Sequence, residues 1–451
     1  MHSGSGAFGF FEVTNDLTKY TNANFLNRLG KQTKLFMRFS TVGGEKGSSD
    51  TARDPRGFAI KLYTEEGNYD IVGNNTPVFF IRDAIKFPDF IHSQKLAPGT
   101  GLKDPDMMWD FFSLNPETMH QMTILFSNRG TPYGFRHMHG FGTDTFMWYT
   151  ENNDYCWIKY HFITNQGIKN FSDREATEAG GKNPFFGRKD LHDAIARGDF
   201  PSWKVYVQIM TREQAKTYKF DPFDATKVWY HKDFPLIPLG KIVLNKNPDN
   251  FFAQVEQSAF APSNMVTGIG PSPDKLLQGR MMAYTDAHRY RLGVNAKNIL
   301  VNKPITEIFN YQRDGLMNTT TNYEGRPNYY PNSFEEVLFD PTAKLPNFEV
   351  EAGIASRHVY KEIDDYVQPG ELYRRVLSEK EKTDLVTNVA LSLVHAKKAI
   401  QYRMCANLYK IDKDYGTRVS YMLKLELEEV IRLSKLSNKE RISETKLSKY
   451  K

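Results

Sequence analysis

The sequence predicts an α+β fold: an antiparallel β-barrel with inserted helices, then a long wrapping segment and a C-terminal helical bundle. Three observations predict it. Apolar and polar residues alternate in several separated runs of the first half, which is typical of strands with one buried face. Residues 300–370 are rich in Asn, Tyr, Pro and Gly and show little periodicity. Residues 378–431 have apolar residues at helical spacing.

The alternating runs place the expected strands at residues 34–42, 57–63, 78–81, 145–163 and 203–210. Helical character at 107–126 and 189–198 interrupts them, so helices are inserted between strands of one sheet. Ser378 and Glu381 match a capping box, which starts the C-terminal helical region. A stretch as long as 300–370 without regular structure should wrap over other elements or other subunits.

These patterns divide the chain into four parts. We expect a β-barrel domain at 1–247, a connection with one long helix at 248–365, a C-terminal helical domain at 366–435 and a basic tail at 436–451.

Composition narrows the function classes. Charged residues form 25% and apolar residues 40% of the 451 residues, as in soluble globular proteins. The sequence has no apolar run of 18 residues and no signal-peptide pattern, so we expect neither membrane insertion nor secretion. Cys156 and Cys405 are far apart, which suits a reducing compartment. Residues 432–451 carry +5 of the net charge of +6, so we expect a solvated basic end rather than a nucleic-acid-binding surface.

Residues 271–293 are the most informative stretch. Ser272 is a good N-cap, Pro273 suits the first helical position and Gly293 is a good stop. Within this helix Arg280 and Tyr284 are four residues apart and share a face. A cation beside a phenol favours the phenolate, which is a hard anionic ligand for a metal. On spacing alone, a surface or packing pair is by far the more common explanation of the two residues.

A second stretch combines strand ends with polar residues. Arg38-Phe-Ser-Thr-Val42 and Val72-Gly-Asn-Asn-Thr-Pro77 place Ser40 and Asn74 at the edges of apolar strands, where they could face a cavity. Gly-Asn-Asn-Thr-Pro is also a good turn, and on spacing alone that ordinary explanation is preferred.

Taken together, these segments resemble the signatures of the haem catalase family. The match runs without a gap from Gly6 to about residue 300, and it continues through 310–315 and 327–333, which resemble the animal branch. The resemblance implies haem b and the disproportionation of hydrogen peroxide to water and oxygen. Tyr284 would be the iron ligand, held as a tyrosinate by Arg280. Asn74 would orient peroxide, Ser40 would bond the distal histidine, and the haem contacts would be Arg38, Val42, Phe87 and Arg291.

The chain departs from the family pattern at the distal histidine. Its expected place, five residues before Gly6, falls on Met1, and His2 is one residue out of register. A shift of one residue along an extended segment turns a side chain to the opposite face. We therefore expect a chain that lacks the family's N-terminal arm and distal base. Asp144 also stands where animal enzymes have a histidine, and it could pair with Arg280 as a fixed charge.

The resemblance extends to an NADPH site, with expected contacts at His120, Ser127, Arg129, Trp229, His231 and Lys232. His139 replaces an expected Asn and Ile163 replaces an expected Lys. The loss of a cation beside the extra phosphate should weaken binding without abolishing it.

Two other functions stay open beside catalase activity. One is a haem-binding catalase-like protein with weak or no turnover, because it lacks the distal histidine. The other is a lyase that acts on fatty-acid hydroperoxides, a use to which related folds have been turned. The resemblance further implies a homotetramer and a peroxisomal location, with the cytoplasm as the alternative because Ser434-Lys-Leu436 is internal.

Overall fold

The chain was analysed as a computed structural model, which describes residues 3–308, 312–338, 340, 343–347 and 364–450. Met1 and His2, on which the expectation about the distal histidine falls, lie outside the described residues. Eight antiparallel strands pair in the order β7-β5-β4-β3-β2-β1-β9-β8, and the β7–β8 pairing closes them into the predicted barrel. The strands are β1 (Gly4–Val13), β2 (Gln32–Ser40), β3 (Gly57–Thr64), β4 (Gly67–Asn74), β5 (Gly140–Phe141), β6 (Phe146–Tyr149), β7 (Tyr155–Thr164), β8 (Ser202–Met210), β9 (Ile237–Lys246) and β10 (Ile269–Gly270).

Alternation along the strands separates two faces of the barrel wall. On β2, Leu35, Met37 and Phe39 enter the large core inside the barrel. Phe36 points the other way and is buried in a separate cluster with Phe260. Because side chains alternate along a strand, Arg38 and Ser40 share the outer face with Phe36. The outer wall of this part of the barrel is therefore covered by the chain around residues 251–301.

One predicted strand is wrong. Residues 78–81 form no strand, whereas residues 67–74 form β4, which pairs with β3 in a hairpin. Val78, Phe80 and Ile81 are nonetheless fully or almost fully buried, and the latter two pack into the core shared with the helices. A short apolar run reports burial, but its period cannot distinguish a strand from a buried loop.

Helices pack against the outside of the barrel and form the C-terminal part of the chain. They are α1 (Phe87–Gln94), α2 (Pro105–Leu114), α3 (Met119–Phe126), α4 (Asp173–Lys182), α5 (Phe186–Ala196), α6 (Arg212–Thr217), α7 (Lys275–Leu292), α8 (Val367–Glu371), α9 (Glu379–Leu393), α10 (Lys398–Ile411), α11 (Lys413–Met422), α12 (Leu427–Ser434) and α13 (Asn438–Glu444). The predicted capping box of Ser378 and Glu381 is present at the start of α9. Helices α9 and α10 pack on α2 and α3 around one apolar core, so the C-terminal helices are joined to the inserted ones.

The basic tail is folded, and most of its charge is exposed. Helix α13 lies within it, and the side chain of Arg441 is fully buried, with its guanidinium donating to Tyr366 Oη over 3.2 Å. Arg403, itself buried, reaches Thr445 O at 3.3 Å. The other basic side chains that the structure describes in the tail are exposed, as expected of a solvated basic end.

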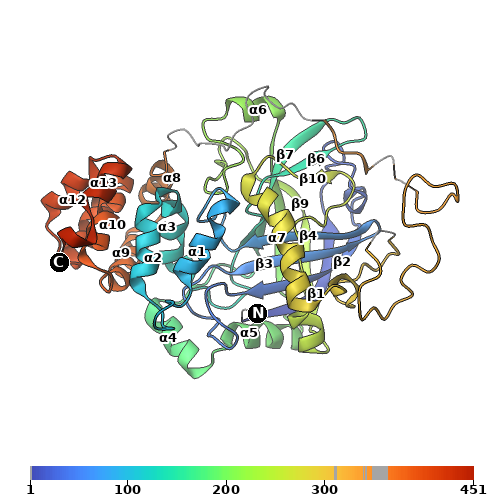
Figure 1. Cartoon of the computed structure of the whole chain (residues 1–451), viewed down its shortest axis with the longest axis horizontal. Helices are drawn as coiled ribbons and strands as arrows, with labels where there is room; N and C mark the ends of the chain where they lie inside the picture. The colour runs from blue at the N-terminus through green and yellow to red at the C-terminus, as the bar shows by residue number, and fades with distance from the viewer. Residues whose placement is uncertain (1–2, 309–311, 339, 341–342, 348–363, 451) are drawn as a thin grey trace.

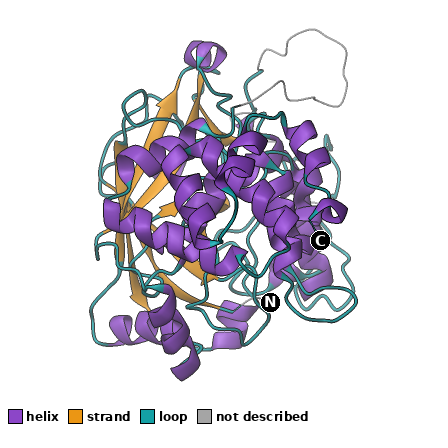
Figure 2. Cartoon of the chain, turned by 90° about the vertical axis from the view of Figure 1, so that its left-hand side faces the viewer, coloured by secondary structure: helices purple, strands orange, loops and turns teal. Residues whose placement is uncertain are grey.

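Helix α7 lies across the outer face of the sheet, over β2, β3 and β4 (Figure 1). Seen from the side of the C-terminal helices, the helices stand in front of the strands (Figure 2). Within the described ranges, no helix has both the length and the apolar character that crossing a membrane requires. The fold thus brings one long helix against one face of a barrel wall, and the candidate site lies between the two.

Candidate functional site

A row of paired residues crosses the outer face of the barrel wall. Ser40 on β2 pairs with Gly57 on β3, and Gly57 pairs with Asn74 on β4. Directly paired residues of neighbouring strands place their side chains on the same face. The middle residue must be small, because a Cβ on Gly57 would lie only 2.5 Å from Ser40 Oγ. The ladder therefore places the two predicted polar residues on one face, on either side of Gly57, with the Ser40 hydroxyl in the space beside the glycine.

Helix α7 presents Arg280 and Tyr284 to this wall. Arg280 Nη2 donates to Tyr284 Oη over 3.2 Å and to Val72 O over 2.5 Å. Val72 is two residues before Asn74 on the same strand, so this contact fixes the phenol beside the polar row. The predicted pairing of cation and phenol is present. The guanidinium thus donates directly to the phenol oxygen.

The helix begins later than the sequence predicted. Its N-cap is Asp274, whose carboxylate accepts from the N–H groups of Leu276 and Leu277. Ser272 instead donates to Thr145 O and accepts from Asp274 N. Gly293 ends the helix as predicted, at a φ of 96° that favours glycine. Both serine and aspartate cap helices well, so composition alone could not choose between them.

Asp144 pairs with Arg280, as its position in the sequence led us to expect. The aspartate side chain is fully buried, and burial raises its pKa against the opposing effect of Arg280. Burial alone would lower the pKa of Arg280, but Asp144 and Tyr284 outweigh it and raise it. Arg280 therefore stays a guanidinium, held from one side by a carboxylate and from the other by the phenol.

Three further guanidiniums gather near the edge of the row. Burial, together with the positive charges of Arg291 and Arg188, lowers the pKa of Arg38 to about 10. Arg291, in the last turn of α7, donates to Ser258 O over 2.7 Å. Mutually repelling cations at a half-buried site favour an anionic group between them, and the carboxylates of a porphyrin are of that kind. The predicted haem contacts Arg38 and Arg291 are thus brought together, and Arg188 joins them.

A cavity of about 520 Å³ opens beside the row and reaches the C-terminal helices. Val42, two residues beyond Ser40, lines it together with Phe79 and Phe80. Phe87 at the start of α1 stacks on Phe79 with 6.4 Å between ring centroids, and it is 44% exposed. The structure therefore places Val42 on the wall of an access cavity, and it places Phe87 one ring behind that wall.

A close contact ties α7 to that cavity wall. A Cβ on Gly279 would lie 2.3 Å from the Cβ of Ala84, so only glycine fits at position 279 beside this alanine. Ala84 begins a short 3-10 helix, Ala84–Lys86, that runs directly into α1. The ligand helix and the element that leads into α1 are in van der Waals contact.

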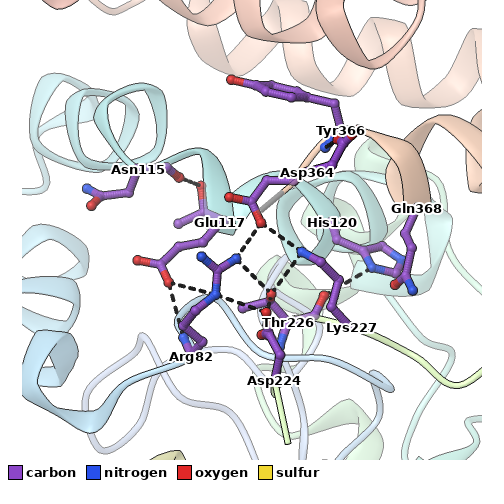
Figure 3. Close-up of polar contacts among 12 residues, drawn as sticks. Arg82, Asn115, Glu117, His120, Asp224, Thr226, Lys227, Asp364, Tyr366 and Gln368 are labelled. Atoms are coloured by element: carbon purple, nitrogen blue, oxygen red, sulfur yellow. Dashed lines mark hydrogen bonds and ion pairs between the residues drawn. The ribbon is translucent and has the colours of Figure 1, made fainter. Parts of the chain in front are cut away.

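The residues predicted for NADPH lie around the junction of the barrel with the C-terminal helices. Figure 3 shows His120 beside Thr226 and Gln368, and His120 Nδ1 is 3.3 Å from Thr226 O. Burial lowers the pKa of His120 to about 4, so it is neutral near pH 7. Gln368 bonds both backbone groups of Val228, with distances of 2.9 and 3.0 Å. These contacts hold the start of α8 against the loop that precedes β9.

The other predicted contacts are spread over neighbouring positions. Ser127 caps the turn Asn128–Gly130 and accepts from Arg129 N. Trp229 is buried, and His231 stacks edge-on against His161 with 5.6 Å between centroids. His139 accepts from Thr164 N. Lys232 lies beside the ring of Tyr230.

The same junction contains a dense set of ion pairs (Figure 3). Arg82 Nε is 3.0 Å from Asp224 Oδ2, and the same guanidinium contacts Asp365. Lys227 Nζ is 2.7 Å from Asp365 Oδ1. Glu117 accepts from the backbone N–H of Arg82 over 3.2 Å. Opposite charges thus lie in direct contact where the two parts of the chain meet.

Sequence reasoning missed Gly57, Lys159, Asp274 and Arg188. Gly57 belongs to the segment Arg53-Asp-Pro-Arg-Gly-Phe58, and a glycine where a strand begins was a signal for close packing. Lys159 and Asp274 gave no signal, because a lysine in a strand and an aspartate before a helix are usually exposed.

Comparison with known proteins bears on the whole chain. The sequence model of the family named Catalase matches residues 1–336, and one described as Catalase-related immune-responsive matches residues 360–423. The Catalase of Methanosarcina barkeri is 55% identical over 444 residues, which cover 98% of this chain and 88% of the relative. The Catalase of Glandirana rugosa is 52% identical over 421 residues, covering 93% and 80%.

Solved structures agree with this assignment. A fungal catalase superimposes with a TM-score of 0.91 at 45% identity, covering 94% of this chain and 86% of the other. Catalase A from Saccharomyces cerevisiae superimposes with a TM-score of 0.90 at 46% identity, covering 93% and 88%. Identity above 50% over more than nine-tenths of the chain, with the same fold, leaves one conclusion: the chain belongs to the catalase family of enzymes.

Proposed function

We propose that this enzyme binds haem b through Tyr284 and disproportionates hydrogen peroxide to water and oxygen. The observation that carries the proposal is the contact of Arg280 with both the Tyr284 phenol and Val72 O, which sets a ligand beside the Ser40–Asn74 row. When bound, the haem iron supplies the redox chemistry by which peroxide is both oxidised and reduced.

The residues present fit that cofactor. Tyr284 would hold the iron, and Arg280 would keep the phenol ionised. Arg38 and Arg291 would bind the two propionates, since their charges repel each other across the edge of the row. Gly57 carries no side chain, so the middle strand of the row would present only backbone to a flat ring system. Phe87 and Val42 would then line the approach from the cavity.

The polar row supplies the chemistry of the protein itself. The side-chain amide of Asn74 would donate to a peroxide oxygen and orient it. Ser40 would bond a base that moves a proton from one peroxide oxygen to the other. Such a base is typically worth about 10²–10⁴ in rate. The best candidate for it in the sequence is His2, which lies outside the described residues.

The second candidate function is a haem-binding protein with weak or no turnover. It is favoured by the sequence register, which places the family's distal histidine on Met1 rather than on His2. The variant His2→Ala separates the two. A fall in oxygen release of 10² or more would show that His2 is the base. Unchanged and slow release in both proteins would favour the second candidate.

The experiment that tests the main proposal is to purify the chain with haem supplied, record its absorption spectrum and follow oxygen release on adding hydrogen peroxide. A high-spin ferric tyrosinate spectrum with rapid oxygen release is the expected result. The same spectrum with little oxygen would support the second candidate. No uptake of haem would overturn the assignment of Tyr284. Adding a fatty-acid hydroperoxide in a parallel assay tests the lyase hypothesis, which predicts its consumption without oxygen.

We further propose that NADPH binds near His120, Ser127, Arg129, Trp229, His231 and Lys232, with reduced affinity. Support comes from the charge of Arg129, which acts on His139. Burial and, to a smaller extent, Arg129 lower the pKa of His139 to about 4, so the two residues lie close together. Ile163 offers no cation there. Nicotinamide fluorescence of the purified protein, titrated with NADPH and with NADH, measures the binding. A dissociation constant far above that of an otherwise identical Ile163→Lys variant is expected.

The assembly state and location are proposals as well. We propose a homotetramer, because α7 and the chain after it expose large apolar side chains, among them Met282, Tyr290, Leu300 and Met317. Mass measurement by sedimentation of the haem-loaded chain tests it, and a monomer would contradict it. We propose a peroxisomal location on family grounds, to be tested by imaging the chain in its own cells.

A further inference from the structure

Two carboxylates are buried together at the base of α7. Asp144 and Asp274 both have no exposed surface. The N–H of Thr145 donates to Asp274 Oδ2 over 3.2 Å, and Ser272 Oγ donates to Thr145 O over 2.5 Å. The turn at residues 143–145 is thereby tied to the first turn of the helix. One carboxylate pairs with Arg280 and the other caps the helix, so the two hold α7 from different sides.

Lys159 on β7 reaches the same turn from the outer face of the wall, because its neighbours Ile158 and Tyr160 point into the barrel core. Its side chain is buried, and its Nζ donates to Thr143 O over 3.0 Å. Thr143 has a φ of 65°, a left-handed conformation that is unfavourable for a β-branched residue. Such a conformation persists only when surrounding contacts hold it. The lysine supplies one of those contacts at the residue directly before Asp144.

The charges in this cluster need the lysine. Burial and, to a smaller extent, the neighbouring Asp144 raise the pKa of Asp274 to about 8, while Lys159 opposes the rise. Burial lowers the pKa of Lys159 against the opposing effects of Asp274 and Asp144, with Asp224 and Asp221 acting more weakly. In the part of the chain that the structure describes, Asp144 Oδ1 has no hydrogen-bond donor. Backbone N–H groups therefore bond both oxygens of Asp274, whereas Asp144 depends on the cation Arg280.

We propose that Lys159 is a positioning residue for the haem ligand, acting through the 143–145 turn and Asp144 on Arg280 and so on Tyr284. With Lys159 present, the 143–145 turn is held and Asp144 stays against Arg280, which donates to the phenol. Without it, the strained turn loses its contact at Thr143, and Asp274 must take up a proton or remain as an unbalanced buried charge. The inference rests on the proposed function, because it takes Tyr284 as the iron ligand.

The test compares the haem-loaded proteins carrying Lys159→Met and Lys227→Met. Lys227 is the matched control because it is also a buried lysine, paired with Asp365 at the junction in Figure 3 and not with the base of α7. For Lys159→Met we expect altered ferric absorption bands and haem loss to a scavenger that is about tenfold faster or more, as for other outer-shell partners. Lys227→Met should lower the melting temperature and leave spectrum and haem retention unchanged.

A double variant keeps the test decisive if Lys159→Met folds poorly. Asp274→Asn retains a capping side chain but removes one buried charge. The pair Lys159→Met with Asp274→Asn should therefore recover folding, absorption bands and haem retention relative to Lys159→Met alone. Lys159→Arg should behave like the parent chain. A Lys159→Met protein that keeps the parent spectrum and haem-loss rate, or a double variant worse than both singles, would overturn the proposal. A parent chain that takes up no haem would instead overturn the proposed function.

Discussion

The two faces of the candidate site are held in different ways. On the sheet face, Ser40 and Asn74 are positioned by the backbone ladder through Gly57, with no charged partner in the row. On the helix face, Tyr284 is positioned by Arg280, which depends on the buried Asp144 and the turn that carries it. Backbone pairing fixes only the positions of the side chains that it carries. A cluster of charges also sets the electrostatic environment of the group that it holds.

This difference separates two kinds of defect. Changes on the helix face should release the cofactor or alter its spectrum. Changes on the sheet face should slow turnover while the cofactor stays bound. The predictions below test that separation, beginning with the largest expected effect.

Removal of the phenol oxygen should have the largest effect. Tyr284→Phe deletes the proposed iron ligand, so haem should be lost faster by more than the roughly 10–100-fold typical of an outer-shell partner. Haem transfer to a scavenger and the ferric spectrum measure it. Tyr290→Phe is the matched control, because Tyr290 is on the same helix and is 85% exposed. Equal haem retention in Tyr284→Phe and the parent would break the comparison.

Removal of the amide on the sheet face should slow turnover alone. Asn74→Ala takes away a positioned donor, and kcat for oxygen release should fall by about 10² with haem content unchanged. Asn68→Ala is the control on the same strand and face, since Asn68 Nδ2 donates to Asn302 O over 2.8 Å, away from the row. If Asn74→Ala lost its haem, the two faces would not be separable.

A methyl group at Gly57 should have a smaller effect. Gly57→Ala would place a Cβ 2.5 Å from Ser40 Oγ, and the hydroxyl must rotate away. We expect a loss of about 1 kcal/mol in stability and a several-fold lower kcat. Combining Gly57→Ala with Ser40→Ala should restore the melting temperature, since the clash is removed, but not the rate. Restoration of both would show that Ser40 does not act in turnover.

Mild acid should lower the stability of the protein through His120, which belongs to neither face of the site. The unfolded chain protonates His120 near pH 6.5, whereas burial lowers its pKa in the folded chain to about 4. The stability that neutral His120 supplies is therefore complete above pH 6.5 and is lost as pH falls to 4, by about 3 kcal/mol. Melting temperatures of His120→Gln should fall less steeply over this range. His192→Gln, at an exposed histidine, is the control.

Much of the fold was predictable. Alternation identified the strands around Met37 and Val205, and the capping box located the start of α9. The pairing of Arg280 with Tyr284 followed from helical spacing, because residues four apart share a face. The strand at 67–74 was missed and a strand at 78–81 was wrongly expected, since burial by helices and burial in a sheet give the same apolar run.

The helix-face charges were out of reach of the sequence. Asp144, Lys159 and Asp274 are separated by up to 130 residues, and no local pattern marks them as neighbours. The pairing of β7 with β5 and β6 brings Lys159 beside the turn that carries Asp144, and the packing of α7 adds Asp274. Register has a similar role on the sheet face: the position of Ser40 opposite Gly57 depends on pairing that a single strand does not encode.

The contact between Gly279 and Ala84 constrains how this family member can evolve. Any residue other than glycine at 279 would collide with the alanine methyl, so a change there requires a compensating shift at 84 or a displaced helix. The two positions should therefore vary together among close relatives, although neither touches the reacting groups. A larger residue at 279 alone would displace α7 relative to the segment that leads into α1, so a change far from the polar row would alter how the helix lies against the sheet.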